Sequence, residues 1–232
     1  MDFRDRHVVV TGGTGALGHA VVGGLIAAGA VCHVPYLAAA EAERFPLRDH
    51  AKVKLVAAID LTDEAAVARL YDGVPDLWAS IHLAGGFDMA AIGKTSKADF
   101  MKQIDLNLVT AFLSCRAAVN AMTRTGGGRI VNVAARPALE WRSGAGMAAY
   151  TASKAAVAAL TAALAEEVVK SGILVNAVAP STMDTPANRA AMPQADHTAW
   201  PKTEEVAATI LFLASPDNKV TRGGVVPVYG RS

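Results

Sequence analysis

The feature that most constrains this chain is a glycine-rich turn placed between a short strand and a helix. Residues 7–11 read H-V-V-V-T, and T-G-G-T-G-A-L-G continues from Thr11 to Gly18. Glycines let the backbone turn sharply and approach a ligand closely, and the helix expected from Ala16 onward offers free N–H groups and the positive end of its dipole. This order of strand, turn and helix is typical of the first unit of a dinucleotide-binding sheet.

The rest of the chain alternates strand-like and helix-like segments. Strands are expected at 7–11, 30–35, 53–59, 77–83, 128–133, 173–178 and 224–228, and the main helices at 16–28, 64–71, 96–123, 148–170 and 203–213. Several strands are continuous Val, Ile and Leu runs, which indicates burial on both faces in a parallel sheet. The pattern predicts one α/β domain over residues 1–232, a Rossmann-type doubly wound parallel sheet of about seven strands with helices on both faces.

Composition excludes several classes of function. The 232 residues hold 22 Lys and Arg against 21 Asp and Glu, a net charge of +1, which argues against nucleic acid or an anionic membrane as partner. The 2 cysteines cannot form a disulfide framework, so buried thiols and a cytoplasmic location are expected. The uncharged stretch 20–40 is long enough for a bilayer, but its glycines and Pro35 favour a helix and a strand.

One long segment shows no regular pattern. Residues 180–201 are rich in proline and include two methionines and Trp200. Irregular loops of this length inside a compact domain are usually functional, and this one follows a late strand, at the edge where such sheets bind ligands. We expect a substrate lid at about 181–201; the alternative is a structural arm in a subunit contact.

Two further patterns suggest chemistry. In Y-T-A-S-K, Tyr150 and Lys154 share a helix face, and an ammonium beside a phenol predicts a lowered tyrosine pKa and a usable proton donor or acceptor. Asp60, after the third strand, could accept a hydrogen bond from an adenine amino group or simply cap a turn. The histidines show no metal-ligand spacing, so no metal site is expected.

Together these patterns resemble the short-chain dehydrogenase/reductase superfamily over the whole chain. The likeness rests on the glycine turn, Asp60, A-G at 84–85, N-L-V-T-A-F from Asn107, Tyr150 with Lys154, and N-A-V-A-P at 176–180. It implies an NAD(P)-dependent oxidoreductase in which Tyr150 is the acid/base, Lys154 holds the nicotinamide ribose and Asn107 bends its helix and positions a relay water. It also implies cofactor contacts at Gly12, Thr14, Ala16, Leu17, Tyr36, Asp60, Leu61, Ala84, Gly85, Lys154, Pro180, Met183 and Thr185.

The chain departs from the superfamily pattern at several positions. Ala16, Leu83 and Ser181 replace a glycine, an asparagine and a glycine. More importantly, the catalytic serine expected after the fifth strand is missing, because V-N-V-A-A ends in Ala134 and Ala135. Loss of one preorganised donor to a substrate oxygen can cost on the order of 10²–10³ in rate. Either Ser143 or a water substitutes, or the substrate does not need the donor.

The last option agrees with a likeness to the dihydropteridine reductases, members that lack this serine. That likeness lies in G-G-T-G-A-L-G, A-G-G-F at 84–87, G-M-A-A-Y at 146–150 and D-T-P-A-N-R-A-A-M-P-Q-A-D at 184–196 followed by Trp200. It implies reduction of a quinonoid dihydropterin or a similar conjugated substrate. The alternatives are a carbonyl or alcohol oxidoreductase of unknown substrate and a nucleotide-binding subunit without turnover.

The remaining expectations concern cofactor, substrate and assembly. Tyr36 stands where NADH-preferring members carry a carboxylate, which favours NADP(H) over NAD(H), with Arg44 the nearest arginine. Trp141, Met147, Met192, Trp200 and also His197 are candidates to line a planar, apolar substrate pocket. The long helices at 96–123 and after Tyr150 are rich in small apolar residues, so a homotetramer or homodimer is expected, as the superfamily resemblance also implies.

Overall fold

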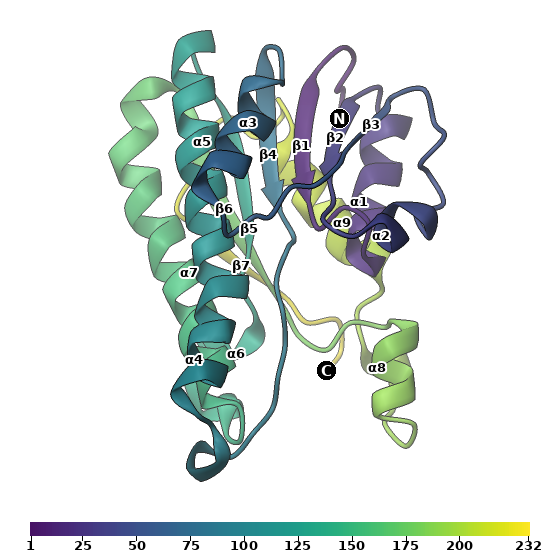
Figure 1. Ribbon diagram of the computed structural model, residues 1–232, viewed down its shortest axis with the longest axis vertical. Coiled ribbons are helices and arrows are strands. Elements are labelled where there is room, and N and C mark those ends of the chain that lie inside the picture. Colours follow the sequence, from purple (N-terminus) through teal and green to yellow (C-terminus); the bar gives the residue numbers. More distant parts are fainter.

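Seven parallel strands form the sheet of the computed structural model, which describes residues 1–232 (Figure 1). Their order across the sheet is β3-β2-β1-β4-β5-β6-β7, and every pairing is parallel. The strands are β1 His7–Thr11, β2 Val31–Pro35, β3 Val53–Val56, β4 Leu77–His82, β5 Gly128–Val133, β6 Ile173–Pro180 and β7 Val225–Val228. The predicted doubly wound parallel sheet is confirmed.

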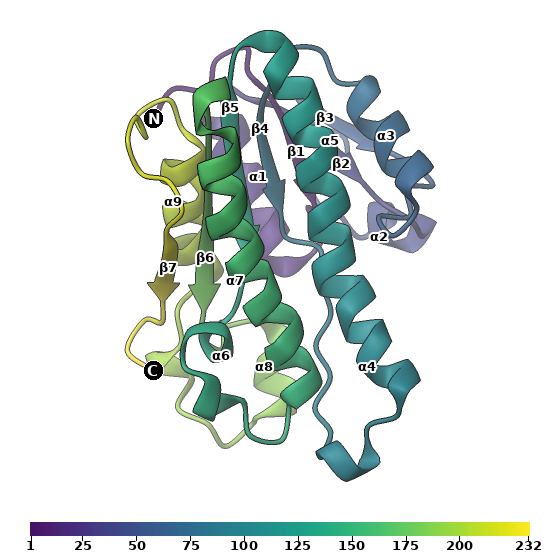
Figure 2. The same ribbon diagram turned by 90° about the vertical axis from the view of Figure 1, so that its left-hand side faces the viewer.

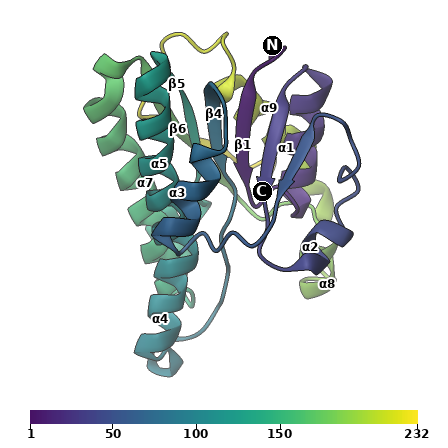
Figure 3. The ribbon, with the colours of Figure 1, turned by 45° about the horizontal axis from the view of Figure 1, so that its top comes forward.

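Helices cover both faces of the sheet. Figures 2 and 3 show α3, α5 and α7 on one face and α1 and α9 on the other. These helices are α1 Ala16–Ala27, α3 Glu64–Asp72, α5 Thr110–Thr125, α7 Ala148–Val168 and α9 Thr203–Ala214. Alternate residues of β1 serve the two layers, since Val8 and Val10 belong to the core under α1 and α9 and Val9 to the core under α3, α5 and α7.

The single helix expected at 96–123 is interrupted. Ser96 caps α4, Lys97–Ile104, through a reciprocal pair of hydrogen bonds with Asp99. A π-helical turn, Asp105–Val109, then joins α4 to α5 and carries Asn107 at its centre. Such turns are frequent at functional sites because the extra residue redirects side chains.

The apolar stretches are parts of the folded sheet layers. The uncharged segment 20–40 consists of most of α1, all of β2 and the residues after it, as expected. By length and composition alone, α7 with its extension to Ser171 could cross a membrane. It packs against β6 and α4, however, and buries Ser153 and Lys154.

Two sequence expectations are wrong near the carboxyl edge of the sheet. The third strand ends at Val56 instead of Ile59, because Ala58 adopts φ of 56°, outside the extended region. The supposedly irregular segment 180–201 contains α8, Pro186–Ala191, and a 3₁₀ turn at His197–Ala199. Two other short helices at this end, α2 Ala39–Glu43 and α6 Arg136–Leu139, were also unforeseen.

Candidate active site

The glycine turn forms a cradle at the point where β1 lies between β2 and β4. Gly12 has φ of 67°, and a Cβ there would lie 2.6 Å from the Ala84 backbone nitrogen. A Cβ on Gly18 would collide with the Gly12 carbonyl oxygen. Helix α1 starts after Gly15 with no capping side chain and no acidic residue in its first turn, so its N-terminal N–H groups stay free for an anion.

The predicted contacts of this turn are therefore backbone contacts. Leu17 is buried with its side chain in the core, which leaves its N–H as the group available to a ligand. Ala84 follows β4, and its N–H donates to the Thr11 hydroxyl at 3.5 Å. The residues expected to contact the cofactor here, Gly12, Thr14, Ala16 and Leu17, all lie in this turn and the first turn of α1, and their backbone groups fit a pyrophosphate.

Asp60 follows β3, four residues after that strand ends at Val56. Its Oδ1 accepts from the Thr62 backbone nitrogen at 2.8 Å and from the Thr62 hydroxyl at 2.7 Å, and these bonds lower the pKa of the carboxyl. The second oxygen, Oδ2, has no internal partner. The helix cap of α3 is Asp63, so Asp60 holds a turn and keeps an oxygen available at the sheet edge.

Tyr36 joins the ends of two strands through its backbone. Its N–H donates to the Val56 carbonyl and its own carbonyl accepts from the Ile59 N–H. The Tyr36 side chain is half-buried at the end of β2 and carries no charge, and Leu61 follows Asp60 with its side chain half-buried.

Lys154 is buried deep beneath this edge. Its side chain is 7% exposed, and the Nζ donates to the Val133 carbonyl oxygen at 2.9 Å. A Cβ on Gly85 would lie 2.6 Å from the Asn107 Oδ1 and 3.4 Å from that Nζ, so glycine is required here by Asn107 and also leaves space beside the ammonium. Burial lowers the pKa of Lys154 to about 8. An ammonium with donors to spare, facing a glycine, fits a ribose hydroxyl.

Asn107 anchors the loop that follows β4. Its Oδ1 accepts from the Gly86 N–H at 3.1 Å, and its Nδ2 donates to the Gly86 carbonyl at 2.9 Å and approaches the Ser153 hydroxyl at 3.2 Å. The π turn directs this side chain toward the loop. The resemblance implied a bend of the helix at Asn107; the structure has a π turn there, and the Asn107 side chain ties α4, α7 and the loop after β4 together.

Tyr150 occupies the first turn of α7. Burial raises the pKa of its phenol to about 12, so the expectation that Lys154 lowers this pKa is wrong for the protein alone. The physical reason is that the ammonium is bonded to Val133 and desolvation dominates. The ring meets Phe87 edge to face, with ring centres 4.9 Å apart and planes at 87°.

Phe87 ends the A-G-G-F motif at 84–87, but the sequence predicts no role for it. The Phe87 side chain is 63% exposed although it touches Tyr150. An exposed aromatic ring beside a largely buried phenol is free to contact a bound molecule. The signal was present in the motif, but the contact between positions 87 and 150 is visible only in the fold.

No side-chain hydroxyl stands where the superfamily serine is expected. Ala134 and Ala135 are both buried, and Ala134 packs in a small cluster with Ala138 and Ala179. Ser143 lies in an exposed 3₁₀ turn, where its hydroxyl donates to the Glu140 carbonyl at 2.8 Å. That hydroxyl is already used within its own turn.

The residues after β6 are held by the short helix α8. The Thr185 side chain caps α8 by accepting from the Asn188 N–H at 3.2 Å, and Asn188 donates back to the Met183 carbonyl at 2.8 Å. Pro180 ends β6, and Thr185 is buried. Asn188 was not singled out in the sequence, yet it fixes both expected cofactor-contact positions.

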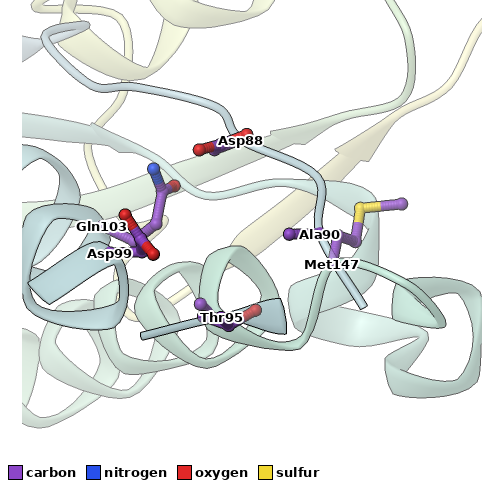
Figure 4. Close-up of a pocket in the computed structure, with 7 residues that line it drawn as sticks. Asp88, Ala90, Thr95, Asp99, Gln103 and Met147 are labelled. Atoms are coloured by element: carbon purple, nitrogen blue, oxygen red, sulfur yellow. The ribbon is translucent and has the colours of Figure 1, made fainter. Parts of the chain in front are cut away.

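The four main substrate candidates do not meet in one pocket. Met147 lines a cavity of about 140 Å³ together with Asp88 and Gln103 (Figure 4), whereas Trp141, 73% exposed, lines a separate groove with Thr151. Met192 ends α8, and Trp200 packs against His197 with ring centres 4.6 Å apart. Trp141 and Met147 thus line different hollows although they come from one segment between α6 and α7, whereas Met192 and Trp200 belong to the segment 180–201.

The comparisons with known proteins identify the class. Residues 6–196 match the family described as short chain dehydrogenase. The chain is 34% identical to galactitol 2-dehydrogenase of Rhizobium johnstonii (96% of this chain, 93% of the relative) and 31% identical to (2S)-[(R)-hydroxy(phenyl)methyl]succinyl-CoA dehydrogenase subunit BbsD of Thauera aromatica (99% and 97%). A solved short chain dehydrogenase/reductase family protein superposes with a TM-score of 0.90 at 29% identity, covering 99% of this chain and 98% of the other.

The chain therefore belongs to the short-chain dehydrogenase/reductase family. Members of this family are NAD(P)-dependent oxidoreductases, and the cradle at Gly12, the open first turn of α1 and the buried ammonium of Lys154 fit such a cofactor.

Proposed function

We propose that the protein is an NAD(P)H-dependent reductase of an electron-poor conjugated substrate, with a quinonoid dihydropterin as the leading substrate class. The observation that carries this proposal is the pair of buried alanines, Ala134 and Ala135, where the family serine is expected. A ketone needs a donor to stabilise the oxygen that becomes negative, whereas a conjugated ring spreads that charge over its own atoms. The lid likeness at 184–196 supports the same substrate class.

Tyr150 is assigned the role of proton donor. The bound cofactor supplies a hydride, so reduction of the substrate requires one further proton. The Tyr150 phenol is protonated at neutral pH, since burial raises its pKa to about 12, and its ring lies beside the exposed Phe87. Lys154 holds the ribose side of the cofactor site, and Asn107 keeps the loop at Gly86 in place.

NADPH is the preferred cofactor in this proposal. Tyr36 at the end of β2 offers no carboxylate to bind the ribose 2′-hydroxyl or to repel a 2′-phosphate. Arg44 caps the end of α2 nearby in the chain. NAD(H) is the alternative, and the same assay with both cofactors decides between them.

The segment 181–201 is proposed as the substrate lid. Its helix α8 lies across from α4 and α6 in Figure 1, and no residue of α8 is buried. An element that buries little of itself moves at low cost. The protein is further proposed to act in the cytoplasm as a homo-oligomer, without nucleic acid or membrane as partner.

A carbonyl or alcohol oxidoreductase is the second candidate. The relatives named above are dehydrogenases, one of them of galactitol, an alcohol. In this case a water or a backbone group takes the place of the missing serine. A third candidate, a nucleotide-binding subunit without turnover, requires that Tyr150→Phe changes no activity.

The test measures oxidation of NADPH and NADH with quinonoid dihydropterin and with a panel of small ketones. Turnover of pterin that falls about 10²–10⁴-fold in Tyr150→Phe supports the proposal. Activity confined to ketones moves the function to the second candidate, and cofactor binding with no turnover on either class contradicts the pterin proposal and leaves an oxidoreductase of another substrate or the third candidate.

Restoring the serine separates the two enzyme candidates further. Ala134→Ser and Ala135→Ser each add a hydroxyl at the expected position, and Ala138→Ser, in the same alanine cluster, is the matched control. Under the proposal, pterin turnover changes little. A gain of tenfold or more in ketone turnover in Ala134→Ser or Ala135→Ser, without such a gain in Ala138→Ser, contradicts the proposal that the substrate does not need the serine.

A further inference from the structure

The residues that follow β7 lie against the residues that follow β6. These strands are parallel neighbours, and their register pairs Pro180 with Val228. The two chain segments therefore leave the sheet side by side. One is the segment 181–201, and the other is residues 229–232, which we call the strap. In Figure 1 the end marked C lies beside the stretches that lead into and out of α8.

The strap contacts the start of the segment through Ser181. The Ser181 hydroxyl donates to the Tyr229 carbonyl oxygen at 3.0 Å and lies 2.7 Å from the Ser232 hydroxyl. Ser181 stands where the superfamily pattern has a glycine, which offers no side chain for these bonds. This departure from the pattern therefore supplies a contact between the segment and the strap.

The strap also contacts the other end of the segment. The Arg231 N–H donates to the Ala199 carbonyl oxygen at 2.9 Å, and the Arg231 guanidinium donates to the Thr198 carbonyl oxygen at 2.9 Å. Gly230 has φ of 64°, and a Cβ there would lie 2.8 Å from the Pro201 backbone nitrogen. Glycine is thus required where the strap crosses Pro201.

Burial divides the segment into a base and a tip. The two ends are joined directly, since the Asp184 N–H donates to the Pro201 carbonyl oxygen at 2.9 Å. Residues 181–185 and 199–201, which we call the base, are all buried or half-buried. All but one of residues 186–194, which we call the tip, are exposed. A part that buries little of itself opens at a lower free energy than a part that is packed and bonded on both sides.

We propose that the strap holds the base in place, so that only the tip moves when a substrate enters. Ser181 and Gly230 are then positioning residues, which act on the substrate site through the base. The base keeps Met183 and Trp200 in fixed positions while the tip opens and closes. This inference rests on the proposed substrate lid and adds which part of that lid moves and what holds the rest.

Hydrogen exchange of the protein without substrate tests this division. The amide of Asp184 in the base and the amide of Met192 in the tip each donate to a carbonyl oxygen at 2.9 Å. We expect the protection factor of the Asp184 amide to be at least tenfold higher, because the tip opens more often than the base. Equal protection of the two amides overturns the claim that the tip moves alone.

Gly230→Ala is designed to separate the strap from the base. The added Cβ collides with Pro201, so the protection of the Asp184 amide is expected to fall at least tenfold. Gly223→Ala is the matched control. Gly223 has a similar φ of 68°, but a Cβ there meets only the Ala165 Cβ, at 3.7 Å. This control has the same backbone strain without a collision with the lid, and it should leave the protection of Asp184 unchanged.

A second pair of variants tests the strap without a collision. Ser181→Ala removes the hydroxyl, and Ser181→Thr keeps one as the conservative control. The protection of the Asp184 amide is expected to fall severalfold in Ser181→Ala and to stay at its original value in Ser181→Thr. Unchanged protection in both Gly230→Ala and Ser181→Ala overturns the strap.

Steady-state kinetics connects the strap to the substrate. With quinonoid dihydropterin, or with the ketone that is turned over, Gly230→Ala should raise KM at least fivefold and change kcat less than twofold, because a loosened base weakens binding and leaves Tyr150 in place. Lower protection of Asp184 with an unchanged KM overturns the role of the strap in substrate binding. The exchange measurements need no turnover, so a failure of pterin reduction does not alter them, and a strap that fails leaves pterin reduction standing.

Discussion

At the scale of single residues, burial determines the pKa of Tyr150 and of Lys154, which is four residues further along α7. Desolvation disfavours the charged form of each group, so it raises the pKa of Tyr150 to about 12 and lowers that of Lys154 to about 8. The sequence spacing alone predicted the opposite direction for Tyr150. A spacing of four residues on a helix places Tyr150 and Lys154 on one face. It does not reveal that the Val133 carbonyl oxygen accepts a hydrogen bond from the ammonium.

These directions predict the pH dependence of reduction. Tyr150 must carry its proton, which it does far above neutral pH, and Lys154 must be an ammonium, which it ceases to be as pH rises through about 8. We expect kcat/KM for the cofactor, which reports groups of the free enzyme, to be level below pH 8 and to fall above it. An arginine keeps its charge up to about pH 12. In Lys154→Arg, the pH at which kcat/KM falls should therefore rise by more than one unit. If kcat/KM of this variant still falls at the same pH, the fall belongs to another group and not to Lys154.

At the scale of helices and strands, the sequence predicted the elements that have a recognisable pattern of apolar residues. The long helices and all seven strands were placed because a buried strand is a continuous apolar run and a long helix has a repeating apolar face. Short helices such as α6 and α8 lack enough residues for a period and depend on local caps. The π turn at Asn107 was not predicted, although the resemblance implied a bend there, since the backbone register of such a turn leaves no mark in composition.

The residues of the candidate site also fall into two groups, those that the sequence predicts and those that only the fold reveals. Gly12, Lys154 and Asn107 stand in motifs that could be read directly. Phe87 could not be found, because it acts through a contact with Tyr150, which is distant in the chain, and it is not an unusual residue by itself.

The cap of α8 gives a prediction for the lid. Thr185→Val removes the side-chain oxygen that accepts from Asn188, at a local cost of about 1 kcal/mol, and Thr185→Ser keeps it as the control. Because α8 buries no residue, the melting temperature should change little. Hydrogen exchange of the Asn188 amide should accelerate, and KM for the substrate should rise severalfold. Faster exchange with an unchanged KM shows that α8 does not cover the substrate.

At the scale of the whole molecule, the polar site and the apolar surface lie on different parts of the fold. The cofactor cradle lies at the carboxyl edge of the sheet, where the neighbouring strands β1 and β4 end, and Tyr150 lies in the first turn of α7. The outer surface of α4 and α5 instead exposes large apolar side chains, namely Phe100, Met101 and Phe112. Apolar side chains gathered on one helix pair are typical of a surface that another protein covers.

This surface gives the last prediction, which tests the proposed homo-oligomer. Phe112 on α5 is 47% exposed, so Phe112→Asp should leave the fold intact and place a charge in the interface. Val220→Asp is the control, because Val220 is 82% exposed in the loop before β7. Sedimentation of the unaltered protein should give two or four times the 24.0 kDa of one chain, and Phe112→Asp alone should shift it toward the single chain. An unaltered protein that sediments as one chain at micromolar concentration contradicts the proposal, and dissociation in both variants moves the interface away from α5.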